Sequence, residues 1–385
     1  MAVSAETVPP CRVLIWYWGR TGAGPLYALE LLRSLAAQPG LKVEGSIAAG
    51  NALRDETEAL ELPLTIVPTY DDRKSFALTT LRLPLIRHSF NKFLRKHRFD
   101  IVLSTMNHLW TPFLVDCVTA SGAAYIPVLH DAKPHPGEAQ PFWCWRRQRE
   151  VNAARAIITL SEAVANGVSQ LNHFPRSNIS VIPYGIPAML GARQEARLFP
   201  TNRPFRFLFF GRIMAYKGLT LLAEAYHLLR AQTQRPCELW IVGAGDFTPY
   251  QAALAKLPDC TIINRWLSDA EITGHLNEAD AVVLPYTEAS QSGVTSQAYA
   301  AGLPVIVTPV GGLAEQVVPD QTGLRSKAAT AEAVATAMLQ MLDPIRYERM
   351  GKAVTAFRAQ NTFMAQGALY ANLFRHVMAQ TGKVA

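Results

Sequence analysis

The sequence predicts an α/β protein with two doubly wound domains, each built on a parallel sheet. Apolar runs of strand length alternate with helical patterns from residue 12 onward, which is the βαβ rhythm of such sheets. The alternation stops at residues 182–204 and then starts again. A chain of 385 residues is also too long for one ordinary core, so two domains of about 150 to 200 residues are expected.

The first domain is predicted to span residues 1–190. Its strand candidates are short apolar runs that are separated by helix-like stretches. In chain order they are RVLIWYW, KVEGSIAA, LTIVP, DIVLS, AYIPVLH, AIITLS and ISVIPY. The segment 182–204 follows them, and its prolines and glycines predict the linker between the domains.

The second domain is predicted to span residues 191–360. Its strand candidates are RFLFF, CELWIV, CTIIN, DAVVLPY and PVIVT. From about residue 329 only helical patterns remain, so a C-terminal helical cap is expected. The last helix, within residues 361–385, should pack back towards the N-terminal domain through apolar side chains, namely Phe363, Leu369, Leu373 and Phe374.

Composition indicates an enzyme that does not cross a membrane. The chain is 49% apolar and 17% charged, and it has no uninterrupted apolar run of the 18 or more residues that span a bilayer. The N-terminal residues MAVSAETVPP do not resemble a secretory signal, so a cytoplasmic protein is expected. The five cysteines form no CxxC pair, which fits neither a disulfide framework nor a zinc site.

The net charge of +7 favours anionic partners, which are nucleotide diphosphates, acidic lipid headgroups or nucleic acid. Residues 82–98 contain six Arg or Lys and no acid, with Ile86, Phe90, Phe93 and Leu94 on one helical face. Two interpretations of this basic amphipathic helix are open: it docks on an anionic membrane, or it is an ordinary surface helix with its apolar stripe on the sheet. Both can hold together, because the stripe can be buried while the charges face lipid. A nucleic-acid partner is not expected, because no base-stacking module accompanies the basic run.

The segment GRIMAYKG, residues 211–218, predicts a diphosphate site. It follows the apolar run 205–210 and precedes a helical pattern, so Arg212 and Lys217 bracket a strand-to-helix turn. Ligands collect beyond the carboxyl ends of parallel strands, and a helix N-terminus adds free N–H groups and partial positive charge. The alternative is that both cations are solvated surface residues.

Two glycine-rich turns follow other strands. GRTGAGP, residues 19–25, contains Gly22 and Gly24, which permit positive φ and close backbone approach. It is not a full GxGxxG pattern, and no acidic residue ends the second strand, so dinucleotide binding is disfavoured. VGAGDF, residues 242–247, contains Gly243, but a lone glycine-rich turn is weak support for any function.

A further candidate is PYTEASQSGVTSQAYAAGLPVIVTPVGGLAEQVV, residues 285–318. A helix is predicted to begin near Ser292 or Gly293, so the backbone N–H groups of Gly293 and Val294 are available to a phosphate or a sugar. Two glycines and a glutamate further on, Gly311, Gly312 and Glu315, are expected to shape a loop rather than to take part in chemistry.

Together with GRIMAYKG, this segment resembles the second-domain signature of the retaining GT-B glycosyltransferases, family 4, also called glycosyl transferases group 1. The resemblance is strongest across residues 205–325, and it extends more loosely to AIITLSEAVANGV, SVIPYGI and the HD of VLHD. It implies two Rossmann-like domains that face a central cleft. The first would bind the acceptor, with Gly22 and Gly24 in an acceptor-side loop, and the second would bind the nucleotide sugar.

The resemblance also implies roles for single residues. Arg212 and Lys217 match the cations that hold the donor diphosphate and stabilise it as a leaving group, so neither metal nor cofactor is expected. The sequence has no Asp-x-Asp pair, which a metal-dependent enzyme of this kind would normally show. His130 matches the family histidine that lies against the transferred sugar. Taken alone it would be a satisfied core residue, but Asp131 follows it as in the family.

One part of the family pattern is missing. Members commonly carry two glutamates eight positions apart, the first on the donor sugar and the second on the ribose. Here the second position holds Gln297 and the first holds Ala289, with Glu288 one position away. Gln297 can still hydrogen-bond a ribose diol without the charge. Either Glu288 shifts into the sugar site, or Gln291 and Ser292 at the helix start supply the sugar contacts. The alternative for Glu288 is an exposed loop carboxylate with no role in binding.

These patterns predict an enzyme that moves a sugar with retention from a UDP- or GDP-linked donor to a hydroxyl of a saccharide or lipid-linked acceptor, in polysaccharide or glycolipid biosynthesis. It would be cytoplasmic and could be peripheral on the inner face of the membrane. Two alternatives stay open: a non-catalytic GT-B subunit that binds nucleotide sugar or lipid, and a GT-B nucleotide-sugar epimerase.

Overall fold

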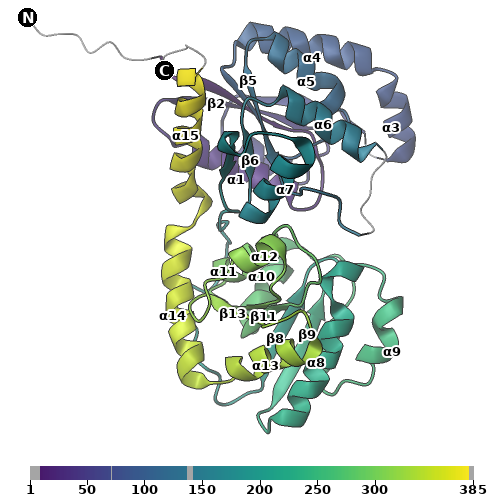
Figure 1. Ribbon diagram of the computed structural model, residues 1–385, viewed down its shortest axis with the longest axis vertical. Helices are drawn as coiled ribbons and strands as arrows, with labels where there is room; N and C mark the ends of the chain where they lie inside the picture. Colours follow the sequence, from purple (N-terminus) through teal and green to yellow (C-terminus); the bar gives the residue numbers. More distant parts are fainter. Residues whose placement is uncertain (1–8, 71, 137–141, 381–385) are drawn as a thin grey trace, which may run out of the picture. The chain divides into compact units, whose positions relative to one another are not determined.

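The computed structural model describes residues 9–70, 72–136 and 142–380. These fall into two compact units (Figure 1). The first unit takes its described residues from Met1–Ala132, Gln140–Pro183 and Phe363–Ala385, and the second from Lys133–Ala139 and Tyr184–Thr362. Each unit is a doubly wound α/β layer structure on a parallel sheet, as the sequence predicts.

The first unit is built on a seven-stranded sheet with the order β3-β2-β1-β4-β5-β6-β7. All neighbouring strands pair in parallel, for example Val13 with Val43 on one side and with Ile101 on the other. The strands are β1 (Cys11–Tyr17), β2 (Leu41–Ala48), β3 (Leu64–Val67), β4 (Ile101–Ser104), β5 (Ala124–Leu129), β6 (Ile157–Thr159) and β7 (Ile179–Val181). The order reverses at β1 and β4, which is where ligands bind in such sheets.

Helices connect these strands and cover the sheet. They are α1 (Gly24–Ala36), α2 (Arg54–Glu58), α3 (Arg73–Thr80), α4 (Leu83–His97), α5 (Thr111–Ala120), α6 (Trp143–Ala153), α7 (Glu162–Asn172) and η1 (Arg176–Asn178), with α15 (Phe363–Gln380) from the end of the chain. Because helices lie on both faces, β1 is apolar almost throughout, and Val13, Leu14 and Ile15 are fully buried.

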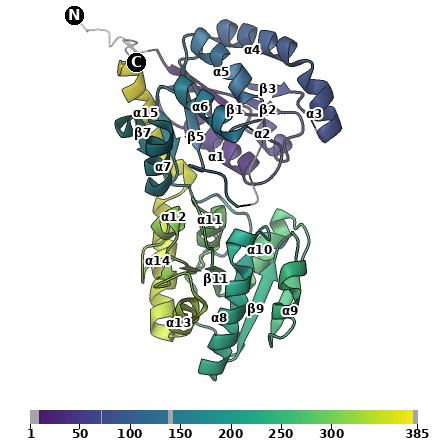
Figure 2. The ribbon, with the colours of Figure 1, turned by 45° about the vertical axis from the view of Figure 1, so that its right-hand side comes forward.

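The last helix, α15, belongs to the first unit and packs on α1 (Figure 2). The hydroxyls of Tyr27 and Tyr370 lie 2.7 Å apart, and Ser34 Oγ donates to the carbonyl of Phe363 at 2.7 Å. A Cβ on Gly367 would lie 2.5 Å from Ser34 Oγ, so the absence of a side chain there lets the two helices approach. The chain thus returns to the first unit after completing the second.

The second unit is built on a six-stranded sheet with the order β10-β9-β8-β11-β12-β13, again parallel throughout. The strands are β8 (Phe205–Phe210), β9 (Cys237–Val242), β10 (Cys260–Ile263), β11 (Ala281–Leu284), β12 (Val305–Val307) and β13 (Gly323–Arg325). The sequence predicts all of these except β13, whose three residues are too few to form a recognisable apolar run.

The helices of the second unit follow its strands. They are η2 (Ala215–Lys217), α8 (Leu219–Gln232), η3 (Thr248–Tyr250), α9 (Gln251–Leu254), α10 (Asp269–Glu278), α11 (Gly293–Ala300), α12 (Gly311–Glu315), α13 (Ala331–Met341) and α14 (Pro344–Gln360). The core between sheet and helices is aromatic at β8, where Phe205, Phe207 and Phe209 are fully buried.

The units divide at Pro183 and Tyr184, before the predicted boundary at residues 190 and 191. The reason is that Ile186 is buried in the second core and bridges to Thr362. Further along, the buried guanidinium of Arg197 donates to the carbonyls of Leu276, Asn277, Ala279 and Ala301, which fixes the predicted linker onto the second unit. Composition predicts a linker but not which core it joins.

Within the described ranges, no helix has both the length and the apolar character needed to cross a bilayer. The basic helix predicted over residues 82–98 forms as α4, and it buries Phe90 and Leu94 in the core of the first unit. Part of its apolar stripe therefore packs on the core of the first unit, which leaves open whether its basic face meets a membrane.

Candidate functional site

The strand-to-helix turn after β8 brings Gly211 and Lys217 together. Gly211 has φ +124° and donates its N–H to the carbonyl of Val242 at 3.0 Å. A Cβ on Gly211 would lie 3.0 Å from Lys217 Nζ and 3.4 Å from a methyl of Val294. The ammonium group, the glycine backbone and the first turn of α11 therefore meet at one point at the carboxyl edge of the sheet.

Lys217 is held in place by the segment that follows β11. The residue is only 9% exposed, and its Nζ lies 5.1 Å from the centre of the Tyr286 ring, within range of a cation–π contact. The carbonyl of Tyr216 accepts from the N–H of Thr287 at 2.8 Å. Gly218 has φ +70°, and a Cβ there would come within 1.9 Å of a backbone oxygen. The turn after β8 and the segment after β11 are thus in direct backbone contact.

Arg212 lies on the same turn, directly after Gly211, and is exposed. The structure therefore places both predicted cations at the carboxyl end of β8, with Lys217 inside the turn and Arg212 on its surface. The ammonium group of Lys217 is thus buried, whereas the guanidinium group of Arg212 stays at the protein surface. Their contact with a diphosphate stays a prediction.

The turn after β9 packs directly on the turn after β8. Gly243 has φ +150°, and a Cβ there would lie 1.9 Å from the carbonyl oxygen of Gly211. Ile213 donates its N–H to the carbonyl of Ala244 at 2.9 Å. Gly243 is thus required for the close approach of two backbones, a stronger reason for a glycine than the sequence alone provides.

The N-terminus of α11 lies beside this turn. Ser292 precedes the helix, but its side chain makes no capping hydrogen bond. Its backbone is held instead by Gln316, whose Oε1 accepts from the Ser292 N–H at 2.7 Å and whose Nε2 donates to the Ser292 carbonyl at 3.1 Å. The first N–H groups of a helix have no partner within it, so those of Gly293 and Val294 are oriented to bind an anion.

Gln291 is the better candidate for the donor-sugar contact. Its Oε1 is buried and has no hydrogen-bond partner among the described residues. Buried polar atoms are nearly always satisfied, so a group outside the described protein, such as a sugar hydroxyl or water, fits here. Gln297 lies one turn further along α11 and is half-buried. Thr295, which the sequence did not single out, has a buried hydroxyl without a partner among the same residues.

Glu288 is engaged by other protein groups. Its Oε1 lies 3.5 Å from His135 Nδ1 and 3.8 Å from Lys133 Nζ. The His135 ring stacks on Tyr216 at 4.8 Å, and its Nε2 lies 3.4 Å from Ser290 Oγ. Glu288 is therefore not an isolated loop carboxylate. Sequence reasoning missed His135, because residues 133–136 follow the fifth strand of the first domain and nothing in their composition shows that they join the second unit.

Ala289 occupies the first family glutamate position without any polar side chain. It is 6% exposed, and its carbonyl accepts from the N–H of Gly312 at 3.2 Å. Gly311 has φ +44°, and a Cβ there would lie 2.0 Å from the same carbonyl oxygen. Gly311 and Gly312 are the first two residues of α12 and Glu315 is its last, so they lie in the helix and not, as the sequence led us to expect, in the loop before it. Their close approach to the Ala289 carbonyl fixes the start of this helix.

In the first unit, His130 directly follows β5 and carries a neutral imidazole. Its Nε2 lies 2.8 Å from the carbonyl oxygen of Thr105, which can only accept, so Nε2 carries the proton and Nδ1 keeps a lone pair. Burial lowers the pKa of His130, although part of the residue remains exposed. The ring lies edge-on to Tyr27 at 5.2 Å. His130 can therefore accept a hydrogen bond from a sugar hydroxyl.

The glycines of the first turn have different roles. Gly22 has φ +84°, and a Cβ there would meet no atom within 4 Å, so its conformation alone calls for glycine. Gly24 begins α1, and a Cβ there would lie 2.3 Å from the hydroxyl of the buried Tyr17. Gly24 is thus needed for packing, and acceptor binding by this loop stays a prediction.

A buried charged cluster on α6 lies near His130 and is not evident from the sequence. Arg147 Nη2 donates to the carbonyl of Asp131 at 2.9 Å, which fixes the backbone directly after His130. Glu150 is fully buried, and desolvation raises its pKa to about 7 against the opposing charges of Arg147 and Arg146. Arg147 and Arg146 lie three and four positions before Glu150 on one helix. Exposed helices show the same spacing, so the sequence does not reveal that the cluster is buried.

Glu150 makes the stability of the protein depend on pH. Because its pKa is higher in the folded state than the usual 4.5, the folded chain binds more protons between about pH 4.5 and 7. Stability should fall as pH rises through this window, and Glu150→Gln should remove up to about 3 kcal/mol of that fall. Urea unfolding of both proteins at about pH 5 and pH 8 measures this pH dependence of the free energy of unfolding. The exposed Glu56→Gln is the control, and equal pH dependence of all three proteins would contradict the assignment.

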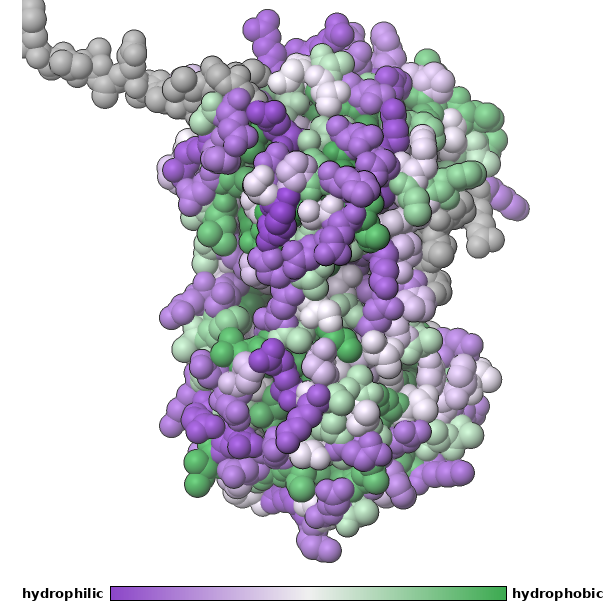
Figure 3. Space-filling view, viewed as in Figure 1, coloured by the Kyte–Doolittle hydropathy of each residue, from purple (hydrophilic) through white to green (hydrophobic). Residues whose placement is uncertain are grey.

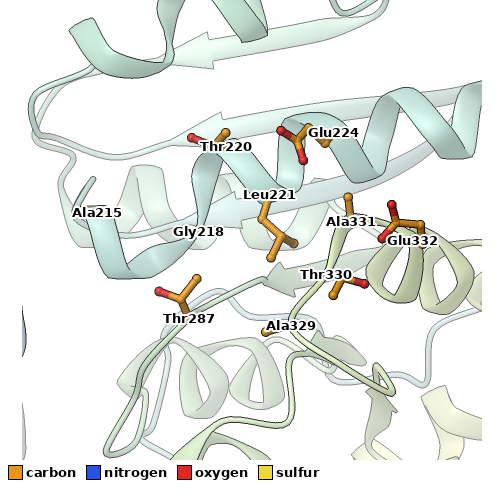
Figure 4. A pocket seen from close by; sticks show the side chains of 10 residues that line it. All are labelled: Ala215, Gly218, Thr220, Leu221, Glu224, Thr287, Ala329, Thr330, Ala331 and Glu332. Carbon is orange, nitrogen blue, oxygen red and sulfur yellow. The ribbon is translucent and has the colours of Figure 1, made fainter.

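A depression of about 410 Å³ lies beside the N-terminal turn of α8 (Figure 4). Thr220 and Glu224 of α8 border it on one side, and Thr330 and Glu332 at the start of α13 on the other. Neither Arg212 nor Lys217 lines it. Two carboxylates disfavour an anion, so this depression is not the diphosphate site.

Two family models match the chain. Residues 26–188 match Glycosyltransferase Family 4, and residues 204–344 match Glycosyl transferases group 1. The chain belongs to the group 1 glycosyltransferases. The resemblance to this family is thereby confirmed. The first matched range contains His130, and the second contains the turns after β8, β9 and β11, whereas Gly22 and Gly24 precede both.

Relatives of this group 1 glycosyltransferase include the glycogen synthase of Mycobacterium tuberculosis (strain ATCC 25618 / H37Rv). It is 30% identical over 207 residues, which are 53% of this chain and 49% of the relative. The D-inositol 3-phosphate glycosyltransferase of Arthrobacter sp. (strain FB24) is 30% identical over 236 residues, 56% of this chain and 55% of the relative. The chain spans about half the length of the curated relatives it matches.

Solved structures share the GT-B fold over nearly the whole chain. HepE of Anabaena in complex with UDP superposes with a TM-score of 0.69 at 15% identity, covering 95% of this chain and 100% of that one. Within the described part of this group 1 glycosyltransferase, no group of three or more His, Cys, Asp and Glu side chains is placed to hold a metal ion. Independence from metal stays a prediction.

Proposed function

We propose that this group 1 glycosyltransferase moves a sugar from a UDP- or GDP-linked donor to a hydroxyl of a saccharide or lipid-linked acceptor. The observation that carries the proposal is the meeting of Lys217, Gly211 and the first turn of α11 at the carboxyl edge of the second sheet. A fixed ammonium and unpaired helix N–H groups form a seat for a diphosphate. A protein with the same fold, HepE, binds UDP.

The diphosphate seat would act chiefly on the leaving group. As the bond between the anomeric carbon and the phosphate oxygen breaks, negative charge grows on that oxygen, and Lys217, Arg212 and the α11 N–H groups would stabilise it. The acceptor oxygen would attack from the face that the phosphate leaves, and its proton would pass to the departing phosphate. This path retains the anomeric configuration and needs no metal.

Contacts to the transferred sugar and the ribose would come from neutral side chains. Gln291 has a buried oxygen without a partner in the described protein, and Gln297 lies on the helix that begins at the diphosphate seat. Neutral His130, whose free Nδ1 accepts hydrogen bonds, would take the role that the resemblance implies for it. The amides of Gln291 and Gln297 would thus take over the contacts of the two family glutamates, and they would bind hydroxyls without adding negative charge near the diphosphate.

The absence of the glutamate pair also favours a second candidate, a GT-B subunit that binds nucleotide sugar without catalysis. Slow hydrolysis of the donor by the purified protein would exclude it. A nucleotide-sugar epimerase would convert the donor with no acceptor present, so analysis of the products separates it from a transferase.

The test of the proposed function is a thermal-shift screen against nucleotide diphosphates and their sugars. A ligand at about 100 times its dissociation constant adds about 2.7 kcal/mol to the stability of the folded state. We expect UDP or GDP and one of their sugars to raise the Tm, and the matching nucleoside monophosphate to raise it less because it lacks the second phosphate. No shift with any nucleotide would contradict the proposal.

An anionic membrane is the second proposed partner. Three leucines near the start of α4 are exposed, Leu78 at 67%, Leu81 at 79% and Leu85 at 69%. The basic face of α4 continues beyond them along a groove that is lined by His88, Asn91, Lys92, Arg95 and Lys96. Figure 3 shows hydrophilic and hydrophobic side chains side by side over α3 and α4. Exposed apolar groups beside cations favour an acidic bilayer surface.

Liposome flotation measures binding to such a membrane. The protein is expected to float with vesicles that contain phosphatidylglycerol and to stay behind with neutral vesicles, because each basic residue near an acidic surface contributes about 1 kcal/mol. Leu81→Asp combined with Leu85→Asp should abolish flotation. The same change at Leu190 and Leu198, which are exposed in the second unit, is the control. Equal binding to both vesicle types would remove the membrane claim.

A further inference from the structure

Residues 133–136 belong to a different unit from their neighbours in the sequence. They are part of the second unit, whereas Ala132 before them and residues 142–183 after them are part of the first. They form neither a helix nor a strand. Such connecting segments add little to a core, and functional residues are disproportionately found on them. The contacts of this segment in the second unit therefore indicate its role.

His135 makes the central contact of this segment. Its side chain is only 10% exposed. Its ring stacks on the ring of Tyr216, with the ring centres 4.8 Å apart and the planes at 19° to each other. Tyr216 directly precedes Lys217 in the turn after β8. His135 therefore packs on the residue next to the lysine of the diphosphate seat.

Two tyrosine rings connect the imidazole of His135 with the ammonium group of Lys217. The Tyr216 ring meets the Tyr286 ring nearly at right angles, with 6.3 Å between the ring centres. The centre of the Tyr286 ring in turn lies 5.1 Å from Lys217 Nζ. Both tyrosines are buried. Because closely packed side chains transmit strain to one another, a change at His135 should displace the ammonium group.

The same imidazole also contacts the segment that leads into α11. Its Nε2 lies 3.4 Å from Ser290 Oγ. Its Nδ1 lies 3.5 Å from Glu288 Oε1, which is within ion-pair distance. Ser290 directly precedes Gln291, the candidate for the sugar contact, and α11 begins two residues after Gln291. His135 thus lies between the turn after β8 and the segment that carries this candidate.

The charge of Glu288 gives the contact a second consequence. A carboxylate on the segment before α11 would repel a diphosphate that binds at the first turn of this helix. Lys133 Nζ lies 3.8 Å from Glu288 Oε1, so an ammonium and an imidazole from one segment both lie near this carboxylate. Groups of the protein thus hold Glu288, which is the reason that it is not the sugar ligand.

We propose that His135 is a positioning residue for the diphosphate seat and that Glu288 acts through it. The inference rests on the proposed function and names the side chain that holds the two halves of the seat together. His135 itself does not touch the donor in this role. It fixes Tyr216 by stacking and residues 288–290 by polar contacts, so the Lys217 ammonium group and the α11 N–H groups keep the spacing that a diphosphate needs.

Calorimetric titration of UDP and of inorganic pyrophosphate into matched variants tests the proposal. GDP replaces UDP if the thermal-shift screen favours it. His135→Ala is expected to raise the Kd of both ligands by the same factor, about 5- to 10-fold, because their shared diphosphate loses its preorganised seat. His135→Phe keeps a ring that can stack on Tyr216, so it should recover most of this loss.

His275→Ala is the matched control. His275 is a histidine of the same unit whose ring meets an aromatic ring, that of Trp240, at 5.9 Å, but it lies on α10 and not at the seat. Its loss should change neither Kd. If His135→Ala does not fold, His135→Gln takes its place, because it loses the stacked ring and keeps polar groups, and the same equal losses are expected.

Glu288→Gln combined with His135→Ala tests whether Glu288 acts through His135. The combination should bind both ligands no more weakly than His135→Ala alone, because the contact between the two side chains is already absent and the charge that is removed opposes a diphosphate. A further loss of about 3-fold or more would show that Glu288 acts on the ligand by itself, and it would overturn this part of the proposal.

The remaining outcomes separate this inference from the proposed function. If the wild-type protein binds UDP and His135→Ala binds UDP and pyrophosphate equally well, the positioning role is overturned and the proposed function stands. A loss for UDP alone would also overturn it, because His135 would then act on the nucleoside and not on the diphosphate seat. If the wild-type protein binds neither a nucleotide diphosphate nor pyrophosphate, both are overturned.

Discussion

Lys217→Ala is expected to lower kcat/KM for the nucleotide sugar by about 10- to 150-fold. A charge-assisted contact in an enclosed site contributes about 1.5 to 3 kcal/mol, and the Lys217 ammonium is held at the seat by the Gly211 backbone and the Tyr286 ring. Because the charge on the leaving phosphate grows as the bond breaks, kcat should fall along with kcat/KM. Steady-state kinetics with the donor found by the thermal-shift screen measure both.

Lys256→Ala is the matched control for this change. Lys256 is an exposed lysine of the same unit, and its loss should leave both constants within a factor of two or so of the wild type, as is usual for surface substitutions. Arg212→Ala should resemble Lys217→Ala in direction. A loss of less than about tenfold in either would contradict the role assigned to that residue.

Gly243→Ala is expected to destabilise the protein by about 2 to 4 kcal/mol. The added Cβ would lie 1.9 Å from the carbonyl oxygen of Gly211, and φ +150° is unfavourable for any residue with a Cβ. Since the second unit can relieve the clash only by moving the Gly211 turn, donor affinity should fall as well. Urea unfolding and UDP titration measure the two effects.

Gly274→Ala is the control within the same unit. Gly274 lies inside α10, and a Cβ there meets no atom within 4 Å. The change should stabilise the helix by about 0.5 to 1 kcal/mol, because alanine is the better helix former. If Gly243→Ala were as stable as Gly274→Ala, the close packing of the two turns would be wrong.

The fold could be predicted because local patterns determine it. The run 205–210 is apolar at every second position and at most of the others, as a strand covered on both faces must be, and it forms β8. The helix expected near Ser292 or Gly293 begins at Gly293. In contrast, β13 has only three residues, and residues 133–136 join the second unit through contacts that are far apart in sequence.

The sequence predicted where the turns of the candidate site lie, but it did not predict most of the contacts that their side chains make. Glycines and the two cations are read from a turn that is continuous in sequence. The contact of Glu288 with His135 and the unpartnered oxygen of Gln291 depend on how separate loops pack, so sequence reasoning could only leave Glu288 and Gln291 as alternatives. The partnered carboxylate and the unpartnered amide together favour Gln291.

The buried cluster around Glu150 shows the same limit. Sequence gives the spacing of Arg146, Arg147 and Glu150 on one helix, which is equally typical of an exposed helix. Only the packing of α6 on α5 and β5 shows that Glu150 is buried, and this burial raises the pKa of its carboxyl group. The hydrogen bond from Arg147 to the backbone after His130 then gives this cluster a part in positioning that histidine.

The central claim is that the second unit holds a diphosphate without a metal ion. The most direct measurement is calorimetric titration of UDP into the wild-type protein and into Lys217→Ala, each in excess EDTA. The account predicts that the wild-type protein binds UDP equally well with and without EDTA and that Lys217→Ala weakens binding by about 10-fold or more. Binding that disappears in EDTA, or that Lys217→Ala leaves unchanged, would contradict it.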